Sequence, residues 1–415
     1  MSGSRFLFTN GILLRTSDAP PLKSFLQTHP GAYTTSRTHN NASCLLFWER
    51  HMKRLSQSIQ ILSNLAPQLL FKSYHSALLL PSFSTFPIRQ PTVQMLVNYS
   101  MCKVLPFALN ERNDCEEFAI TTLVSGNLEE LNACDAVTEE RMSKILDVHV
   151  HIETYVPPTF GICGNGVHLA VVGYGRQVAA AKYSDWVRIR KTLEKLRPPS
   201  VTELLLSNDG NHILEGCVTN FFVVCCKDWD SNDRKALRDY RNKYSFEVQT
   251  APISDGVLPG TIRELVLEYD LIINLTSSCY IFFNHKETAP LICRSEGIQF
   301  REVAPSWSEQ EIWEEAFITS IILAIQFFYS FSVQMLKNNS LRLLQHVDSI
   351  QVPTEWQSAQ SKTWKDVSWT KKQFQVGEPG MITTVIQEKI MEKAILEGYP
   401  ISNIYAATLS AVSVT

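Results

Sequence analysis

Residues 179–186 read AAAKYSDW and residues 214–222 read LEGCVTNFF, and these two stretches decide the fold. Lys182 follows three alanines near the end of a predicted strand and loop, whereas surface lysines usually have polar neighbours. Glu215 stands beside the apolar run Phe221–Cys226, so we predict that its carboxylate is half buried and has a partner. Taken one at a time, a solvated lysine and a strand-end salt bridge remain the simpler interpretations.

Two further stretches precede them in the chain, GAYTTSRT at 31–38 and ERHMKRL at 49–55. Residues 47–62 place apolar side chains at helical spacing, which predicts a helix with its basic side chains, Arg54 among them, on the other face. Residues 259–268, PGTIRELVLE, begin with Pro-Gly and predict a helix whose N-terminal amides can receive an anion. Taken alone, Arg54 is a solvated arginine.

Alternating and β-branched residues, with turn residues between them, predict the remaining elements. Asn10-Gly11 predicts a hairpin over 5–14, and the prolines of 66–115 predict short helices and loops. A Pro-Gly start after Glu378 predicts an amphipathic closing helix. Strands are expected from Ala32 and over 118–126, 148–156, 166–175, 201–207 and 220–226, and a helix over 183–196.

In their order and spacing, these stretches resemble the class IV, or fold-type IV, pyridoxal-phosphate enzymes. That family includes branched-chain aminotransferases, D-amino acid aminotransferases and 4-amino-4-deoxychorismate lyases. The resemblance extends from about Phe6 to Val352, and its most specific part is Lys182 followed 33 residues later by Glu215 in EGCVTNFF. The HMKRL helix and LPGTIR at 258–263 are the next most specific parts.

The resemblance implies an α+β fold of two domains, similar to D-amino acid aminotransferase, with pyridoxal 5'-phosphate (PLP) between the domains. We expect a smaller N-terminal α/β domain over residues 1–160 and a larger C-terminal cofactor-binding domain over residues 161–415. Members of this family are commonly homodimers, so the resemblance also implies a homodimer.

The family's motifs imply roles for individual residues. Lys182 would form the internal aldimine with PLP and then act as the base that carries the α-proton. Glu215 would keep the pyridine nitrogen protonated, so that the ring can accept electrons, and Asn220 belongs to the same signature. Arg54 would bind the 5'-phosphate through its guanidinium.

Four further residues belong to the implied site. The backbone amides of Thr261 and Ile262 would contact the phosphate, although the family usually reads Gly-Ile-Thr-Arg and the middle pair is inverted here. Tyr33 and Arg37 would line the substrate side and receive a carboxylate. The stretch TTLVSGN at 121–127 lacks the arginine and histidine with which D-amino acid aminotransferases trap the carboxylate, and this argues against that specificity.

Two stretches serve no motif of the family, residues 269–292 and residues 321–339. The second splits a predicted phosphate-binding turn, because its deletion joins Thr319-Ser320 to Ser340 and restores the expected length and hydroxyl. We interpret both stretches as retained introns. Sequencing of the transcript tests this interpretation, which predicts that both segments are absent from the mature message.

The resemblance implies PLP-dependent transfer of an amino group between an amino acid and a 2-oxo acid through a Lys182 aldimine. An aminodeoxychorismate lyase uses the same cofactor and the same lysine, so the sequence does not separate these two reactions. A third alternative is a catalytically impaired member of the family that acts as a scaffold, because its phosphate segment is interrupted although Lys182 and Glu215 are intact.

Composition excludes several other classes of protein. The 415 residues are 45% apolar and 19% charged, and the net charge of -3 comes without a basic run that would bind nucleic acid or an anionic membrane. Ala316–Leu336 has no charge over 21 residues, which is the length of a membrane span. Its serines and glutamines, and its place inside a motif, argue against that alternative.

The cysteines and the N-terminus indicate the compartment. The ten cysteines are scattered without a CxxC pair, which predicts reduced thiols, and MSGSRFLFTNGILL lacks the features of a secretory signal. We expect a cytoplasmic enzyme, and an organelle such as the plastid remains an alternative. No metal site is predicted, because His149 and His151 have no third ligand nearby, and Cys225-Cys226 lies in an apolar strand.

Overall fold

The computed structural model describes residues 4–15, 17–71, 86–114, 116–157, 160, 166–226, 246–268, 298–322, 342–359, 362–374 and 377–412. Contacts within the chain define two compact units. Unit 1 comprises Met1–Pro158, Arg176–Leu196 and Ala394–Thr415, and unit 2 comprises Thr159–Gly175 and Arg197–Lys393. Unit 1 therefore includes the segment that carries Lys182, although this segment follows residue 160 in the chain.

Unit 1 is built on an antiparallel sheet whose described strands run in the order β16-β4-β3-β5-β6-β1-β2. The predicted hairpin is confirmed, because Phe8 pairs with Leu13. Asn10 and Gly11 have φ angles of 47° and 87°, which is the left-handed backbone that a two-residue turn between twisted strands requires. The strands are β1 (Arg5–Thr9), β2 (Ile12–Arg15), β3 (Ala32–His39), β4 (Cys44–Leu45), β5 (Glu117–Gly126), β6 (Leu146–Tyr155) and β16 (Tyr399–Pro400).

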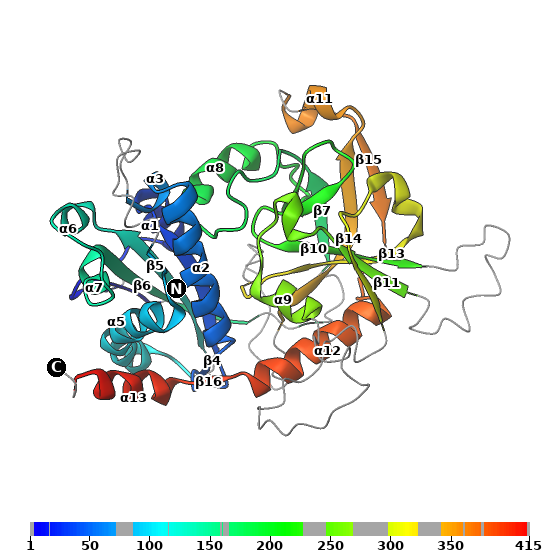
Figure 1. The fold of residues 1–415 in the computed structure, drawn as a ribbon. Coiled ribbons are helices and arrows are strands. Elements are labelled where there is room, and N and C mark those ends of the chain that lie inside the picture. The colour runs from blue at the N-terminus through cyan, green and yellow to red at the C-terminus, as the bar shows by residue number, and fades with distance from the viewer. Residues whose placement is uncertain are drawn as a thin grey trace, which may run out of the picture. The chain divides into compact units, whose positions relative to one another are not determined.

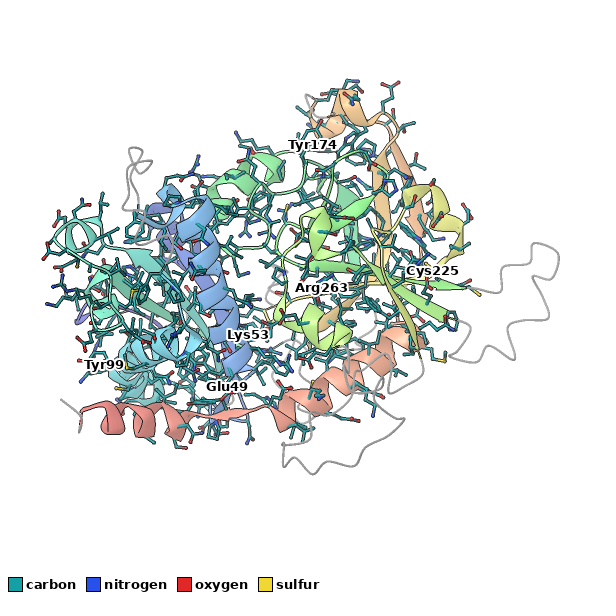
Figure 2. The ribbon with its side chains drawn as sticks, viewed as in Figure 1. Glu49, Lys53, Tyr99, Tyr174, Cys225 and Arg263 are labelled. Atoms are coloured by element: carbon teal, nitrogen blue, oxygen red, sulfur yellow. The ribbon has the colours of Figure 1, made fainter. Side chains whose placement is uncertain are left out.

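Helix α2 (Trp48–Leu65) packs against β3 and confirms the helix predicted over 47–62. Its apolar residues repeat every three or four positions and are buried, whereas Glu49 and Lys53, labelled in Figure 2, are exposed. The other helices of unit 1 are α1 (Leu22–Thr28), α3 (Gln68–Phe71), α5 (Gln90–Glu111), α6 (Leu128–Asn132), α7 (Met142–Ile145), α8 (Asp185–Glu194) and α13 (Ile401–Val412).

The prediction of only short helices and loops over 66–115 was wrong, because α5 is one helix of 22 residues. Pro91 lies in its first turn, where the missing N–H removes no helical hydrogen bond. Pro106 lies inside the helix, but a continuous buried face offsets the hydrogen bond that this proline removes. That face consists of Val93, Val97, Met101, Val104, Leu105 and Ala108.

Unit 2 is built on a second sheet, in the order β12-β11-β10-β13-β14-β7-β8-β9, with β15 paired to β14. The sheet is mixed, because β7 is parallel to β8 and β14 while β13 is antiparallel to β10 and β14. The strands predicted over 166–175, 201–207 and 220–226 are confirmed. The strands are β7 (Val167–Val171), β8 (Glu203–Ser207), β9 (Ile213–Gly216), β10 (Asn220–Cys226), β11 (Phe246–Thr250), β12 (Gln299–Glu302), β13 (Trp313–Thr319), β14 (Leu344–Pro353) and β15 (Trp369–Gln373).

Helix α9 (Thr261–Leu267) confirms the helix predicted over 259–268. Helix α11 (Trp356–Ala359) follows later in the chain. Helix α12 (Met381–Leu396) follows the Pro-Gly start, but it does not close the chain as predicted, because β16 and α13 come after it. Helix α13 packs beside α5 (Figure 1). The N-terminal N–H groups of α12 are satisfied by Glu315, whose two carboxylate oxygens accept from Ile382 N and Thr383 N.

The two atypical stretches fall largely outside the described residues. Residues 269–292 lie entirely outside them, and residues 321–339 are described only at Ile321 and Ile322. The apolar run that was considered as a membrane span starts in β13, because Ala316–Thr319 form the end of that strand. Among the described residues, no helix has the length and apolar character needed to cross a membrane.

Candidate active site

The predicted site residues form two groups, one in each unit. Unit 1 contains Tyr33, Arg37, Arg54 and Lys182, and unit 2 contains Glu215, Asn220, Thr261, Ile262, Thr319 and Ser320. Ser340 lies outside the described residues. Each group is held by contacts within its own unit.

Lys182 is fixed by backbone hydrogen bonds to β3 and α2. Its carbonyl accepts from Tyr33 N over 2.9 Å, and its own N–H donates to Ser58 Oγ over 3.1 Å. The Lys182 Nζ atom lies 4.8 Å from the centroid of the Tyr33 ring, within the range of a cation–π contact. The lysine therefore starts from a rigid backbone, and its amine lies over the ring of Tyr33.

The segment approaches β3 closely because Gly31 precedes the strand. Ser184 N donates to Gly31 O over 2.9 Å. Gly31 has a φ angle of 146°, and a Cβ atom at this position would lie 2.3 Å from Val124 O. Only glycine allows the start of β3 to lie beside β5 and also to pair with the lysine segment.

Arg54 is buried on α2 within a polar group that includes two residues that were not predicted. Its guanidinium Nη2 donates to Thr34 Oγ1 over 2.8 Å and lies 3.3 Å from His51 Nδ1. Thr34 Oγ1 and His51 Nδ1 are also 2.8 Å apart. Burial lowers the pKa of His51 well below its usual value, and the positive charges of Arg54 and Lys182 lower it further. His51 is therefore neutral at physiological pH.

Arg37 lies four residues after Tyr33 on β3, and its side chain is 0% exposed. Its Nη1 atom donates to Tyr155 Oη over 3.3 Å, and its guanidinium carbon lies 5.4 Å from the centroid of the Tyr155 ring. Burial lowers the pKa of Arg37, whereas Tyr155 and Glu117 act in the opposite direction. The guanidinium is thus already engaged by β6, a partner that the sequence did not indicate.

Glu215 and Asn220 hold the same peptide segment in unit 2. Glu215 is only 2% exposed, so it is more deeply buried than predicted, and its Oε2 atom accepts from Leu258 N over 2.9 Å. Asn220 Nδ2 donates to Leu258 O over 2.9 Å. The two residues of the EGCVTNFF motif therefore fix the chain immediately before α9.

Helix α9 begins beside Asn220. A Cβ atom on Gly260 would lie 2.0 Å from Asn220 Oδ1, so only glycine fits at this position. Thr261 follows as the first helical residue, and its buried Oγ1 atom has no hydrogen-bond partner among the described residues. Arg263, labelled in Figure 2, anchors the helix through Ala251 O at 2.9 Å and Glu302 Oε1 at 2.7 Å.

Thr319 lies beside Asn220, because it pairs with this residue in the register of β13 and β10. The Thr319 Oγ1 atom is buried and, within the described part of the chain, has no hydrogen-bond partner. Ser320 follows, and its hydroxyl donates to Ile322 O over 3.2 Å. Two residues close to Asn220, its strand partner Thr319 and Thr261 after Gly260, thus have buried hydroxyls that are available to an anionic or hydroxyl-bearing ligand.

The residues that were rejected as metal or cysteine sites have structural partners. His149 lies between Thr9 Oγ1 at 3.0 Å and Ser125 Oγ at 3.3 Å, and His151 lies 2.9 Å from Pro20 O. Burial raises the pKa of Cys225 to about 12, so its thiol stays protonated and is a poor nucleophile. No cluster of three metal-ligating side chains occurs among the residues that the structure describes.

Comparison with known proteins matches residues 31–277 to the family described as amino-transferase class IV. A search of curated proteins found no significant match. Among solved structures, the chain is similar to the branched-chain aminotransferase of Thermoproteus uzoniensis, at 16% identity and a TM-score of 0.53, covering 96% of this chain and 100% of that one. These values concern the fold, and they confirm the expected fold class.

Two further solved structures give the same result. The branched-chain aminotransferase of Escherichia coli is 14% identical, with a TM-score of 0.51 and 94% of each chain covered. A hypothetical aminotransferase of Mycobacterium tuberculosis in its PLP-bound form is 11% identical, with a TM-score of 0.51, 94% of this chain and 99% of that chain covered. The similarity therefore extends over both units.

Proposed function

The chain belongs to the class IV aminotransferases, which depend on PLP, and from this premise we propose that it transfers an amino group between an amino acid and a 2-oxo acid. The observation that carries the proposal is the fixed position of Lys182, whose backbone is bound to β3 and α2 while its amine stays near Tyr33. A lysine held in this way has the rigid support that a catalytic amine needs.

The residues of the chain fit the cofactor. PLP has an anionic phosphate, and unit 2 offers the buried hydroxyls of Thr261 and Thr319, which have no partner among the described residues. Unit 1 offers the Arg54 guanidinium. For each unit by itself, we propose phosphate ligands. In unit 1 this is Arg54, and in unit 2 these are the hydroxyls of Thr261, Thr319, Ser320 and Ser340 with the amides of Thr261 and Ile262. When bound, PLP supplies an aldehyde that takes up the amino group and a ring that accepts electrons.

Lys182 would hold the cofactor covalently. Once the substrate amine has replaced it, its free Nζ atom would take the proton from the α-carbon of the substrate and carry it to the carbon of the cofactor that bore the aldehyde. Glu215 would hold a proton on the ring nitrogen of the cofactor. Its buried carboxylate and its hydrogen bond from Leu258 N support this role, because a charge in a site of low dielectric acts strongly on its neighbour.

Tyr33 and Arg37 remain the proposed substrate residues. They lie on the same face of β3, since an even number of positions separates them. Arg37 already donates to Tyr155, so we propose that a substrate carboxylate would share the guanidinium with this tyrosine. We also propose a homodimer, to be tested by light scattering, and a cytoplasmic location, to be tested by microscopy of a tagged chain.

Three measurements test the proposed function. The purified protein with PLP is incubated with an amino donor and 2-oxoglutarate, and separately with aminodeoxychorismate, and the products are identified. Borohydride reduction followed by peptide mapping should place the cofactor on Lys182. The variant Lys182→Ala should lose this label and its activity, whereas Lys53→Ala, an exposed lysine of α2, should retain both. If the protein catalyses elimination from aminodeoxychorismate but no amino transfer, it is a lyase. If it does not bind PLP, it is a scaffold.

A further inference from the structure

Helix α2 carries a polar stripe on its buried side. His51, Arg54 and Ser58 follow each other at spacings of three and four residues, so they lie on one face of the helix. All three are buried although the helix exposes Glu49 and Lys53 on its other side (Figure 2). Buried polar residues in a helix that packs on a sheet require partners, and here these are Thr34 on β3 and the backbone of Lys182.

The hydrogen bonds of this stripe have a defined direction. A guanidinium has only donors, so Arg54 Nη2 donates to Thr34 Oγ1, and the oxygen is the acceptor. The hydrogen of the Thr34 hydroxyl is then directed to His51 Nδ1, 2.8 Å away. This requires His51 Nδ1 to be unprotonated, which agrees with the lowered pKa of the buried ring beside Arg54 and Lys182.

The neutral state of His51 matters for Arg54. A protonated imidazole 3.3 Å from the guanidinium would repel it and would leave Thr34 without an acceptor for its hydrogen. With a neutral ring, both hydrogen bonds have a matched donor and acceptor, because Arg54 donates to Thr34 and Thr34 donates to His51. A long arginine side chain whose Nη2 atom is already oriented loses fewer conformations when a ligand binds to the guanidinium.

We propose that Thr34 and His51 are positioning residues that orient the Arg54 guanidinium for the phosphate of PLP. This inference rests on the proposed function, since it takes Arg54 as a phosphate ligand. Neither residue contacts the cofactor in this proposal, and both act through Arg54. The effect should therefore concern the affinity for the phosphate group rather than for the rest of the cofactor.

The test compares Thr34→Val, which removes the hydroxyl and keeps the shape, with Thr34→Ser, which keeps the hydroxyl. Each apoprotein is titrated with PLP and with pyridoxal, which lacks the phosphate, and binding is followed by absorbance. We expect Thr34→Val to bind PLP about tenfold more weakly or worse, with pyridoxal binding unchanged, while Thr34→Ser stays within about threefold of wild type for both. Equal losses for PLP and pyridoxal would indicate a structural disturbance of Lys182 and would overturn the proposal.

A double-mutant cycle supplies the second test. In an Arg54→Ala background, Thr34→Val should cause no further loss of PLP affinity, because its effect passes through Arg54. If Thr34→Val does not fold, His51→Leu replaces it in the same cycle with the same expectation. Additive losses in the cycle refute the positioning role. A wild-type protein that does not bind PLP would refute the proposed function itself. If the wild type binds PLP and Thr34→Val binds it with the same affinity, only the positioning role of Thr34 and His51 is refuted.

Discussion

Thr319 pairs with Leu344 in the register of β13 and β14, although residues 320–343 lie between them in the chain. Ser320 extends this pairing, because its N–H donates to Leu343 O over 3.2 Å. The two ends of the segment that we propose for phosphate binding are therefore held side by side by backbone hydrogen bonds. Gln387 of α12 supports the returning end, since its Oε1 atom accepts from Leu343 N and Leu344 N.

This pairing predicts that residues 321–339 are dispensable for folding. Their deletion leaves Ser340, Leu341 and Arg342 between the paired residues Ser320 and Leu343, and a loop of three residues is a common hairpin connection. We expect the deletion variant to unfold at the same or a higher temperature and to bind PLP at least as tightly as the full chain.

The control for this deletion replaces 321–339 by a Gly/Ser segment of equal length, and circular dichroism and PLP titration are compared for the three proteins. If the deletion variant fails to fold while the Gly/Ser replacement folds, the fold requires a connection of this length between β13 and β14, whatever its sequence. Sequencing of the transcript separately tests whether the segment belongs to the mature message.

Glu215→Gln should reduce transamination without unfolding unit 2. A glutamine keeps an oxygen that can accept from Leu258 N, but it removes the negative charge that we assign to the ring nitrogen. The loss of one preorganised electrostatic group predicts a fall in kcat of about a hundredfold or more. Glu203→Gln is the matched control, because Glu203 lies on the neighbouring strand β8 and also accepts a backbone N–H, that of Val218. Similar kcat values for both variants would argue against the role of Glu215.

His149 should make the protein sensitive to acid. Burial, with a smaller effect from His29, lowers the pKa of His149 from 6.5 to about 4 in the folded chain. The unfolded chain therefore binds a proton first as the pH falls, and the free energy of unfolding decreases from about pH 6.5 down to about pH 4, by roughly 3 kcal/mol in total. Above pH 6.5 this histidine contributes no pH dependence.

Urea unfolding at pH 7 and pH 5 measures this effect. His149→Gln carries no titrating ring at this position, so its free energy of unfolding should fall less between the two values than that of the wild type. The same fall in both proteins would assign the acid sensitivity to other residues.

Gly260→Ala should destabilise the start of α9. The new methyl group would lie 2.0 Å from Asn220 Oδ1, and overpacking of this kind costs about 1–3 kcal/mol. Gly398→Ala is the control, because the nearest atom to a Cβ there is Ile395 O at 3.4 Å, an ordinary contact. Urea unfolding of both variants should show the larger loss for Gly260→Ala, and the opposite order would contradict this account of the α9 start.

The class of the fold could be predicted from the sequence because its strongest signals are local. Asn10-Gly11 has the backbone preference of a tight hairpin, and its turn occurs where predicted. The apolar spacing of 47–62 predicts α2, and the lysine and EGCVTNFF motifs predict the family that the comparison confirms. In each case the residue types of a short stretch carry the information.

Other features depend on contacts between distant parts of the chain. The prolines of 66–115 led to a wrong prediction for α5. The helix forms because the free energy gained by burying its apolar face against neighbouring elements exceeds the cost of one lost hydrogen bond. Arg37 donates a hydrogen bond to Tyr155, which lies 118 positions later in the chain. The backbone of Leu258 forms hydrogen bonds with both Glu215 and Asn220, which lie 43 and 38 positions earlier.

By itself, the sequence determined the family to which this protein belongs, since a lysine, a carboxylate and an arginine of the family's types stand at recognisable spacings. Only the tertiary structure decided how these groups are held. The Thr34 hydroxyl orients toward both His51 and Arg54 because β3 packs on α2. Thr261 and Thr319, whose hydroxyls are buried, lie close to Asn220 because β13 pairs with β10 and α9 begins beside this asparagine. The physical reason is that hydrogen bonds act over about 3 Å in space, whatever the separation along the chain.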